Sequence, residues 1–326
     1  MVTKTGTRRV RGLAALAAVA VVTVTATSAC AGSSSSSANL SSSASASAGG
    51  GNPLAPSASN TVVVGSANFP EDELLAEIYI LALQAKGVKV TAKLNIGARE
   101  VYYPQVEKGA ISIIPEYNGT LLSVEVNPKS TAKTTAAVDA ALASGLPSSL
   151  EVLNPAPAQD SDSVTVTAAT AAKDHLKSIA DLASYASKFS IGGPPEFKTR
   201  VDGLVGLKST YGLTFKNFVP LDESGPITLA ALQDGKVQAA DVFTTTPQII
   251  SDHLVSLSDP KFNFAAQNVI PLVYKPALTP TIESVLNAIS AKLTTSALLQ
   301  MDNAVITQHA NYSTVAAGFL KAEGLS

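Results

Sequence analysis

Residue types that could carry out catalysis are few and scattered in this chain. The three histidines, His175, His253 and His309, lie far apart, and none has a partner at the spacing of a metal site. The single cysteine, Cys30, lies near the amino end. No serine-nucleophile elbow, phosphate-binding loop or dinucleotide-binding glycine motif follows a strand-like segment. We therefore predict no catalytic residues, no metal and no cofactor.

Polar, aromatic and charged side chains instead gather in four short segments. Each segment joins a strand-like run to a helix-like run, and the four comprise residues 65–73, 95–102, 113–120 and 192–200. Strand-to-helix turns are where open α/β sheets present their ligands, and helix amino ends there offer free N–H groups to an anion. The segments therefore predict a binding site for a small solute.

The elements that must position these segments alternate between strands and helices. Strands are expected at Thr61–Val64, Val88–Leu94, Ile111–Ile114, Phe189–Ile191, Phe215–Pro220 and Val237–Phe243. Helices are expected at 71–86, 100–108, 178–187, 196–211 and 227–234, and from Thr281 to the end with breaks near Thr294 and Asn311. This alternation predicts an α/β fold with mixed, mostly parallel sheets.

Two extended stretches interrupt the alternation. Residues 150–166 are rich in proline, and residues 268–276 form a second extended stretch. We interpret them as two crossings between two lobes, with a ligand cleft between the lobes. One lobe would comprise residues 60–160 and 267–326, and the other residues 161–266.

The amino end has the three-part layout of a secretory signal peptide. Lys4, Arg8, Arg9 and Arg11 precede an apolar run over residues 12–24 that is too short to span a bilayer. Residues 27–30 resemble a bacterial lipobox, which predicts a signal peptide at 1–29 and lipidation of Cys30. The alternative is an ordinary signal peptide followed by an unrelated cysteine. Residues 30–59 are rich in Ser, Ala and Gly and predict a flexible tether.

Charge and hydropathy exclude several classes of protein. The net charge is −2, and acidic and basic residues are interspersed, so nothing indicates a nucleic-acid partner. The chain is 46% hydrophobic, but no apolar stretch after the signal peptide is long enough to span a bilayer.

Several short motifs resemble those of one family, the ABC-type glycine betaine/choline/carnitine (osmoprotectant) binding proteins of the ProX or OpuC type. The motifs are Gly65-Ser66, Ile96-Gly97-x-Arg99-Glu100, Pro115-Glu116-Tyr117-x-Gly119-Thr120, Pro195-Glu196-Phe197-x-x-Arg200, Asp202-Gly203-x-x-Gly206-Leu207, Tyr211-Gly212-Leu213, Ala240-Asp241-Val242-Phe243-Thr244-Thr245 and Asp259-Pro260-Lys261. Together they cover nearly the whole body, residues 60–320. The resemblance implies a two-lobed, periplasmic-binding-protein-like fold of type II that closes over its solute.

The resemblance also assigns candidate ligand residues. Tyr117 matches a tyrosine of the aromatic cage that holds a trimethylammonium group, and Thr120 matches a polar contact beside it. Arg200 matches the clamp for the ligand carboxylate, and its planar fork suits that role. Phe243 stands where the family often has another cage tyrosine, and Asp160 matches a hinge-side acid.

Three positions depart from the family. Asp162 and Gln267 stand where binders with a full cage have tyrosines, and Ala67 stands where several members have a lysine. The cage is therefore expected to be incomplete. An alternative is a receptor of the same fold for a larger, neutral or polyhydroxylated solute, and an exported α/β enzyme is a further alternative.

Some candidates also have a purely structural interpretation. Tyr117 could be a packing tyrosine, and Arg200 a surface cation paired with Glu196. Arg99 with Glu100 is interpreted as a structural turn or a transporter-facing feature.

The expected partners follow from the family. They are a small solute, a membrane permease with its ATPase, and the membrane itself through the lipid anchor. We expect a monomer on the outer face of the cytoplasmic membrane, without nucleic acid.

Overall fold

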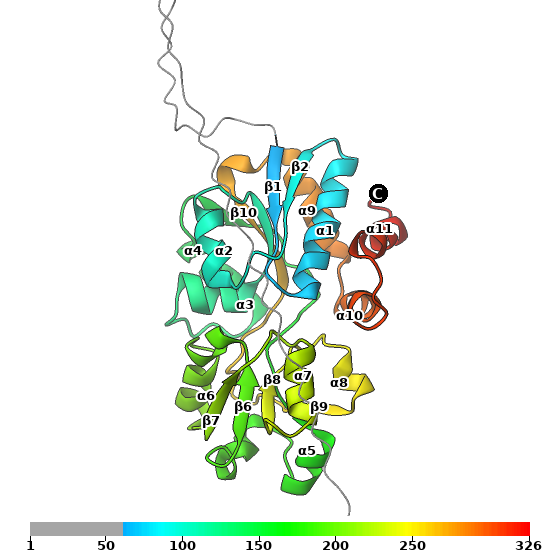
Figure 1. Cartoon of the computed structure of the whole chain (residues 1–326). Helices are drawn as coiled ribbons and strands as arrows, with labels where there is room; N and C mark the ends of the chain where they lie inside the picture. The colour runs from blue at the N-terminus through cyan, green and yellow to red at the C-terminus, as the bar shows by residue number, and fades with distance from the viewer. Residues whose placement is uncertain (1–60) are drawn as a thin grey trace, which may run out of the picture. The chain divides into compact units, whose positions relative to one another are not determined.

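Residues 61–326 are the part of the chain that the computed structural model describes (Figure 1). They contain two mixed β-sheets with helices packed against them. The predicted signal peptide, the lipidation site Cys30 and the tether lie outside the described residues.

The first sheet combines strands from both ends of the described range. Its order is β2-β1-β3-β10-β4, with β1 at Thr61–Gly65, β2 at Lys89–Lys93, β3 at Ile113–Tyr117, β4 at Leu150–Val152 and β10 at Val269–Tyr274. β1 pairs in parallel with β2 and β3, whereas β10 is antiparallel to β3 and β4. β10 is thus inserted into a sheet whose other strands lie before residue 153.

The second sheet is built from one continuous stretch of chain. Its order is β7-β6-β8-β5-β9, with β5 at Val164–Thr167, β6 at Ser190–Gly193, β7 at Asn217–Pro220, β8 at Ala239–Asp241 and β9 at Leu254–Ser256. β6 pairs in parallel with β7 and β8, and β5 is antiparallel to β8 and β9. In both sheets the antiparallel pairs involve the strand that follows a crossing, β10 or β5.

Two neighbouring segments connect the sheets. The chain leaves β4, passes through residues 153–163 to β5, and returns after β9 through residues 257–268 to β10. Gln159 and Asn268 form an antiparallel bridge, and the Asp160 N–H donates to the Gln267 carbonyl oxygen at 3.1 Å. The two crossings that the sequence predicts therefore lie side by side.

Helices cover both faces of the first sheet. On one face, α1 (Pro70–Ala85) contributes Leu74, Leu75 and Ile78, which are completely buried. Burial of each such side chain contributes roughly 1.5–3 kcal/mol to stability. α2 (Arg99–Glu107) and α4 (Thr135–Gly145) pack on a second core at this sheet. The short helix α3 (Asn118–Thr120) continues β3, and a π-helical turn follows at Leu121–Val126.

The carboxyl end is helical, as predicted. α9 (Pro280–Lys292), α10 (Thr295–Asp302) and α11 (Tyr312–Ala322) follow a 3-10 turn at Lys275–Ala277, and a π-helical turn at Asn303–Thr307 separates the last two. The predicted breaks at Thr294 and Asn311 are N-caps whose side chains accept backbone N–H bonds. Capping explains why these residues interrupt an otherwise helical pattern.

Of the helices predicted beside the second sheet, the one at 227–234 is present within one residue, whereas those at 178–187 and 196–211 differ from the prediction. The helices beside this sheet are α5 at Ala168–Asp174, α6 at Leu204–Tyr211, α7 at Pro226–Gln233 and α8 at Gln248–Ser251. The helix expected at 178–187 is a 3-10 turn at Ile179–Ser184, which begins at a capping box between Ser178 and Asp181.

The helix expected at 196–211 is interrupted. A 3-10 turn at Pro195–Lys198 ends before a tight loop, and α6 begins only at Leu204. A Cβ on Gly203 would lie 2.0 Å from the Phe197 carbonyl oxygen, so the chain turns here too tightly for any other residue. The periodicity of the segment does not reveal this turn. The turn carries Arg200, whose side chain lines the cavity described below.

Candidate functional site

One cavity brings all of the predicted ligand residues together. It encloses about 450 Å³ of space, part of it open to solvent. Its lining includes every predicted residue: Tyr117, Thr120, Asp160, Asp162, Arg200, Phe243 and Gln267. They come from the end of β3, the first crossing, the loop before α6, the segment after β8 and the second crossing.

Three aromatic rings form a contiguous wall of this cavity. The Phe69 ring centroid lies 6.1 Å from that of Tyr117 in a tilted arrangement. It lies 5.2 Å from that of Phe243 in an edge-to-face arrangement. Phe69 is the N-cap residue of α1 and was not assigned from the sequence, although it lies within the first polar segment. With Phe69, the aromatic wall is more complete than the sequence predicts.

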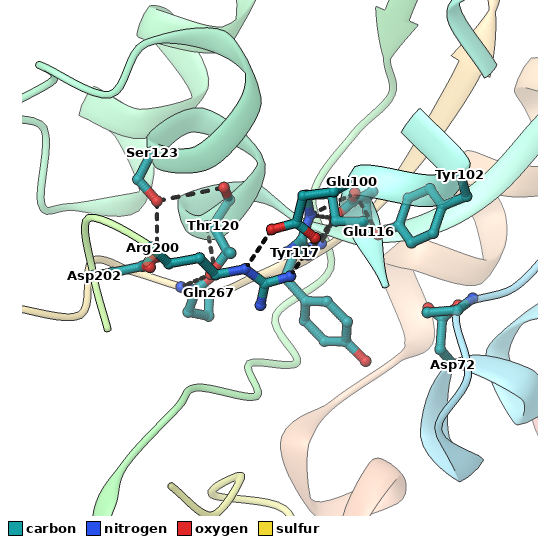
Figure 2. A network of polar contacts seen from close by, with 12 residues as sticks. Asp72, Glu100, Tyr102, Glu116, Tyr117, Thr120, Ser123, Arg200, Asp202 and Gln267 are labelled. Carbon is teal, nitrogen blue, oxygen red and sulfur yellow. Dashed lines mark hydrogen bonds and ion pairs between the residues drawn. The ribbon is translucent and has the colours of Figure 1, made fainter. Parts of the chain in front are cut away.

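Gln267 and Thr120 bind each other rather than standing free. The Thr120 N–H donates to Gln267 Oε1 at 3.0 Å, and Gln267 Nε2 donates to Thr120 Oγ1 at 2.6 Å (Figure 2). Both side chains are buried. A Cβ on Gly119 would lie 2.3 Å from the Ala266 carbonyl oxygen, so glycine allows this close approach. The pair fixes the second crossing to the end of β3 and forms one side of the cavity.

Arg99 contributes a buried ion pair to the lining. Its Nε and Nη2 each lie 2.8 Å from an oxygen of Glu116, which is fully buried. The Tyr102 hydroxyl donates to the same carboxylate at 2.7 Å. Arg99 and Tyr102 both line the cavity. Of the two interpretations of Arg99, the buried ion pair agrees with a structural role, and its burial does not agree with a transporter-facing position.

Arg200 forms a bidentate ion pair with Glu100 from α2. Its Nε and Nη2 donate to Glu100 Oε1 and Oε2, each at 3.0 Å (Figure 2). Glu196, the partner suggested by helical spacing, binds Arg200 only through the backbone, where the Arg200 N–H donates to the Glu196 carbonyl oxygen at 3.0 Å. The guanidinium pairs with Glu100 instead. The π-helical turn at Leu121–Val126 also binds the loop that carries Arg200: Ser123 Oγ donates to Asp202 Oδ2 at 2.8 Å.

Three acidic side chains line the cavity: Asp160, Asp162 and Glu223. Burial raises the pKa of Asp162 to about 6, and the charge of Asp202 adds to the rise. Burial and contact with Glu196 raise the pKa of Glu223 to about 8. Burial also raises the pKa of Asp160, while bonds from Thr244 and Thr245 oppose the rise. A cation in the cavity would stabilise the ionised form of all three.

A pair of buried carboxyls lies behind the aromatic wall. The Tyr117 hydroxyl donates to Glu71 Oε1. Burial raises the pKa of Glu71, and the charge of neighbouring Asp302 adds to the rise. Burial also raises the pKa of Asp302 to about 7. The Glu71 bond fixes the orientation of the Tyr117 ring toward the cavity.

Among residues 61–326, no group of three or more His, Cys, Asp or Glu side chains is arranged to hold a metal ion. Within the same range, no helix combines the length and apolar character needed to cross a membrane.

Comparison with known proteins gives matches over most of the chain. A family model described as the substrate binding domain of an ABC-type glycine betaine transport system (OpuAC) matches residues 60–322. The glycine betaine-binding protein YehZ of Escherichia coli strain K12 is 28% identical over 280 residues, which are 82% of this chain and 92% of that protein.

Solved structures match the same region. The structure of a glycine betaine/carnitine/choline ABC transporter protein has a TM-score of 0.63 at 21% identity, over 81% of this chain and 99% of that one. A choline binding protein in complex with choline has a TM-score of 0.61 at 16% identity, over 83% of this chain and 91% of that one. These likenesses confirm the predicted fold class.

Proposed function

Because the chain belongs to the OpuAC family, the substrate-binding domains of ABC-type glycine betaine transport systems, we propose that its cavity captures a small quaternary ammonium compound for import. Membership confirms the family that the motifs predict, which is a family of transporter substrate-binding proteins. The observation that carries the proposal is the joint presence of an aromatic wall and buried acids in one cavity.

The chemistry of the wall suits a trimethylammonium group. The faces of Phe69, Tyr117 and Phe243 attract a cation through their quadrupoles, each by roughly 0.5–2 kcal/mol. A quaternary nitrogen has no N–H, so none of its hydrogen bonds is lost on leaving water. Asp160 and Asp162 add electrostatic attraction that rings alone do not supply. The acid at position 162 thus takes over part of the role of a missing ring.

Closure of two lobes is the proposed binding motion. Residues 60–160 with 267–326 form one lobe in this proposal, and residues 161–266 form the other. The separate cores of the two sheets support this division. The adjacent crossings near Asp160 and Gln267 would act as the hinge. A ligand that contacts both lobes favours the closed form over the open one.

Delivery would take place at the outer face of the cytoplasmic membrane. We propose that residues 1–29 direct export and that Cys30 is lipidated. The Ser/Ala/Gly-rich segment up to residue 59 would tether a monomeric body. The docking partner would be a membrane permease driven by a cytoplasmic ATPase.

A thermal-shift panel tests the ligand class. The panel would comprise glycine betaine, choline, carnitine, proline betaine, ectoine, polyols and aromatic compounds. We expect the melting temperature to rise with at least one quaternary ammonium compound, because a ligand of the native state stabilises it. A response to polyols or neutral compounds alone would contradict the proposal and favour the alternative receptor of the same fold.

Substitution of the aromatic wall provides the matched test. Phe69→Ala should weaken binding of the responding compound about tenfold, the loss expected for one ring. Phe262→Ala is the control, because Phe262 is 60% exposed and does not line the cavity. Calorimetric titration of both variants measures the difference.

A further inference from the structure

The carboxylate clamp expected at Arg200 already holds a carboxylate of the protein. Glu100 receives two parallel N–H bonds from the Nε and Nη2 edge of the guanidinium, each at 3.0 Å. This is the fork geometry by which arginine binds the carboxylate of a ligand. A ligand carboxylate would therefore have to displace Glu100 or accept the remaining donors of a guanidinium whose charge is already balanced.

The second arginine of the cavity is balanced in the same way. Arg99 is paired with the fully buried Glu116. Each arginine of the lining therefore has its own protein carboxylate. Asp160, Asp162 and Glu223, in contrast, have no lysine or arginine within ion-pair distance in the described part of the chain. At neutral pH Asp162, whose pKa is about 6, is mostly ionised and has no arginine or lysine to balance it, so the charge left over in the cavity is negative.

The negative charge of the cavity affects a zwitterionic betaine and a simple cation differently. The ammonium head of either compound is attracted to the acids and the aromatic wall. The carboxylate of a betaine is repelled by ionised Asp162 and has no unbalanced arginine to bind. A choline-type cation carries a hydroxyl in place of the carboxylate and escapes this repulsion.

Building on the proposed function, we propose that Glu100 is a specificity-determining residue. By neutralising Arg200, it makes the site select quaternary ammonium cations that lack a carboxylate over betaines. The ligand class is thereby narrowed to choline-type alcohols and related organic cations.

The position of Glu100 indicates that it can be substituted to test its role in specificity without affecting folding. Glu100 lies in the first turn of α2, and its side chain is 42% exposed, whereas that of Arg200 is 12% exposed. Its side-chain hydrogen bonds within residues 61–326 both come from Arg200. Removal of its charge should therefore leave the core of the protein intact.

Calorimetric titration with choline chloride and with glycine betaine tests the inference. The wild type should bind choline at least about tenfold more tightly than betaine, a difference of 1.4 kcal/mol. Glu100→Gln should shift this ratio toward betaine by about tenfold or more. Glu100→Ala leaves both Arg200 donors, Nε and Nη2, without Glu100 as acceptor, and should shift the ratio of the two affinities at least as far. Glu107→Gln is the matched control, because Glu107 ends the same helix, is exposed and does not line the cavity.

Each outcome has one meaning. A wild type that prefers betaine, or a ratio that stays the same in both Glu100 variants, overturns the role of Glu100 and leaves the proposed function standing. A wild type that binds neither compound nor any other quaternary amine overturns the proposed function itself. A thermal melt of each variant checks that it is folded before titration.

Discussion

Asp162 is a cavity residue whose charge changes just below neutral pH. Burial raises its pKa to about 6, with Asp202 adding to the rise and Arg200 and Arg99 opposing it. Its other acidic neighbour, Asp241, is fully buried and has its own pKa raised by burial and by Asp162. At pH 5 the Asp162 carboxyl is therefore mostly neutral, and above pH 7 it is mostly ionised.

Affinity for a cation should consequently rise with pH. The bound cation favours the ionised carboxylate, so binding releases protons, and the dissociation constant should fall between pH 5 and pH 8 as Asp162 and then Glu223 ionise. Asp162→Asn should weaken choline binding about tenfold at pH 8 and flatten the lower part of this profile. Titration calorimetry at several pH values measures both effects.

Asp174→Asn serves as the control for this profile, since Asp174 lies on α5 and does not line the cavity. A dissociation constant that is independent of pH in the wild type would contradict the role given to Asp162.

Prediction of individual site residues from the sequence depended on local signals. The segments that contain Tyr117, Thr120 and Arg200 could be found because each is a polar turn after a strand, and the resemblance to the family then assigned these residues. Phe69 lies in such a turn too, but nothing local says that its ring meets those of Tyr117 and Phe243. The partner of Arg200 was missed because Glu100 is 100 positions away, and pairing at that separation leaves no periodic trace.

At the scale of elements, the loop before α6 determines where Arg200 points. Gly203→Ala would place a Cβ 2.0 Å from the Phe197 carbonyl oxygen, and backbone cannot move as a flexible side chain does. We expect the free energy of unfolding to fall by at least about 2 kcal/mol. Ligand affinity should also fall, because the loop carries Arg200.

Gly318→Ala is the matched control for this substitution. Gly318 lies within α11, and a Cβ there has no neighbour within 4 Å. Alanine should stabilise the helix by roughly 0.5–1 kcal/mol. Urea unfolding of both variants gives the comparison, and an equal effect of the two substitutions would argue against a tight turn at Gly203.

Elements with a long amphipathic pattern were the most predictable. α1 was found within a residue or two because its buried leucines and isoleucine recur at helical spacing and glycine follows its end. α4 was not predicted, since its alanine-rich sequence has only Val138 and Leu142 fully buried. The helix predicted at 196–211 was wrong in its first half, whereas α6 confirms its second half. The break depends on the close approach of Gly203 to the Phe197 carbonyl oxygen, which helix propensity does not reveal.

At the scale of the whole molecule, the proposed membrane attachment depends on one residue. Cys30→Ser removes the only thiol of the chain and with it the proposed site of acylation. We expect the variant to move from the membrane fraction to the soluble exported fraction while solute binding by the purified protein stays unchanged. Fractionation followed by detection of the protein measures this shift. Equal membrane association of the variant and the wild type would argue against the lipid anchor.

The insertion of β10 between β3 and β4 also affects the order in which the chain can fold. All strands of the second sheet lie within residues 164–256 and are synthesised before β10 at 269–274. β4 pairs with β10 alone among the described strands, so it cannot join its sheet until most of the chain has been translated. Pairing over such a sequence separation is slow. The proposed export would benefit from this delay, because the first sheet would stay incomplete, and so able to cross the membrane unfolded, until β10 has been synthesised.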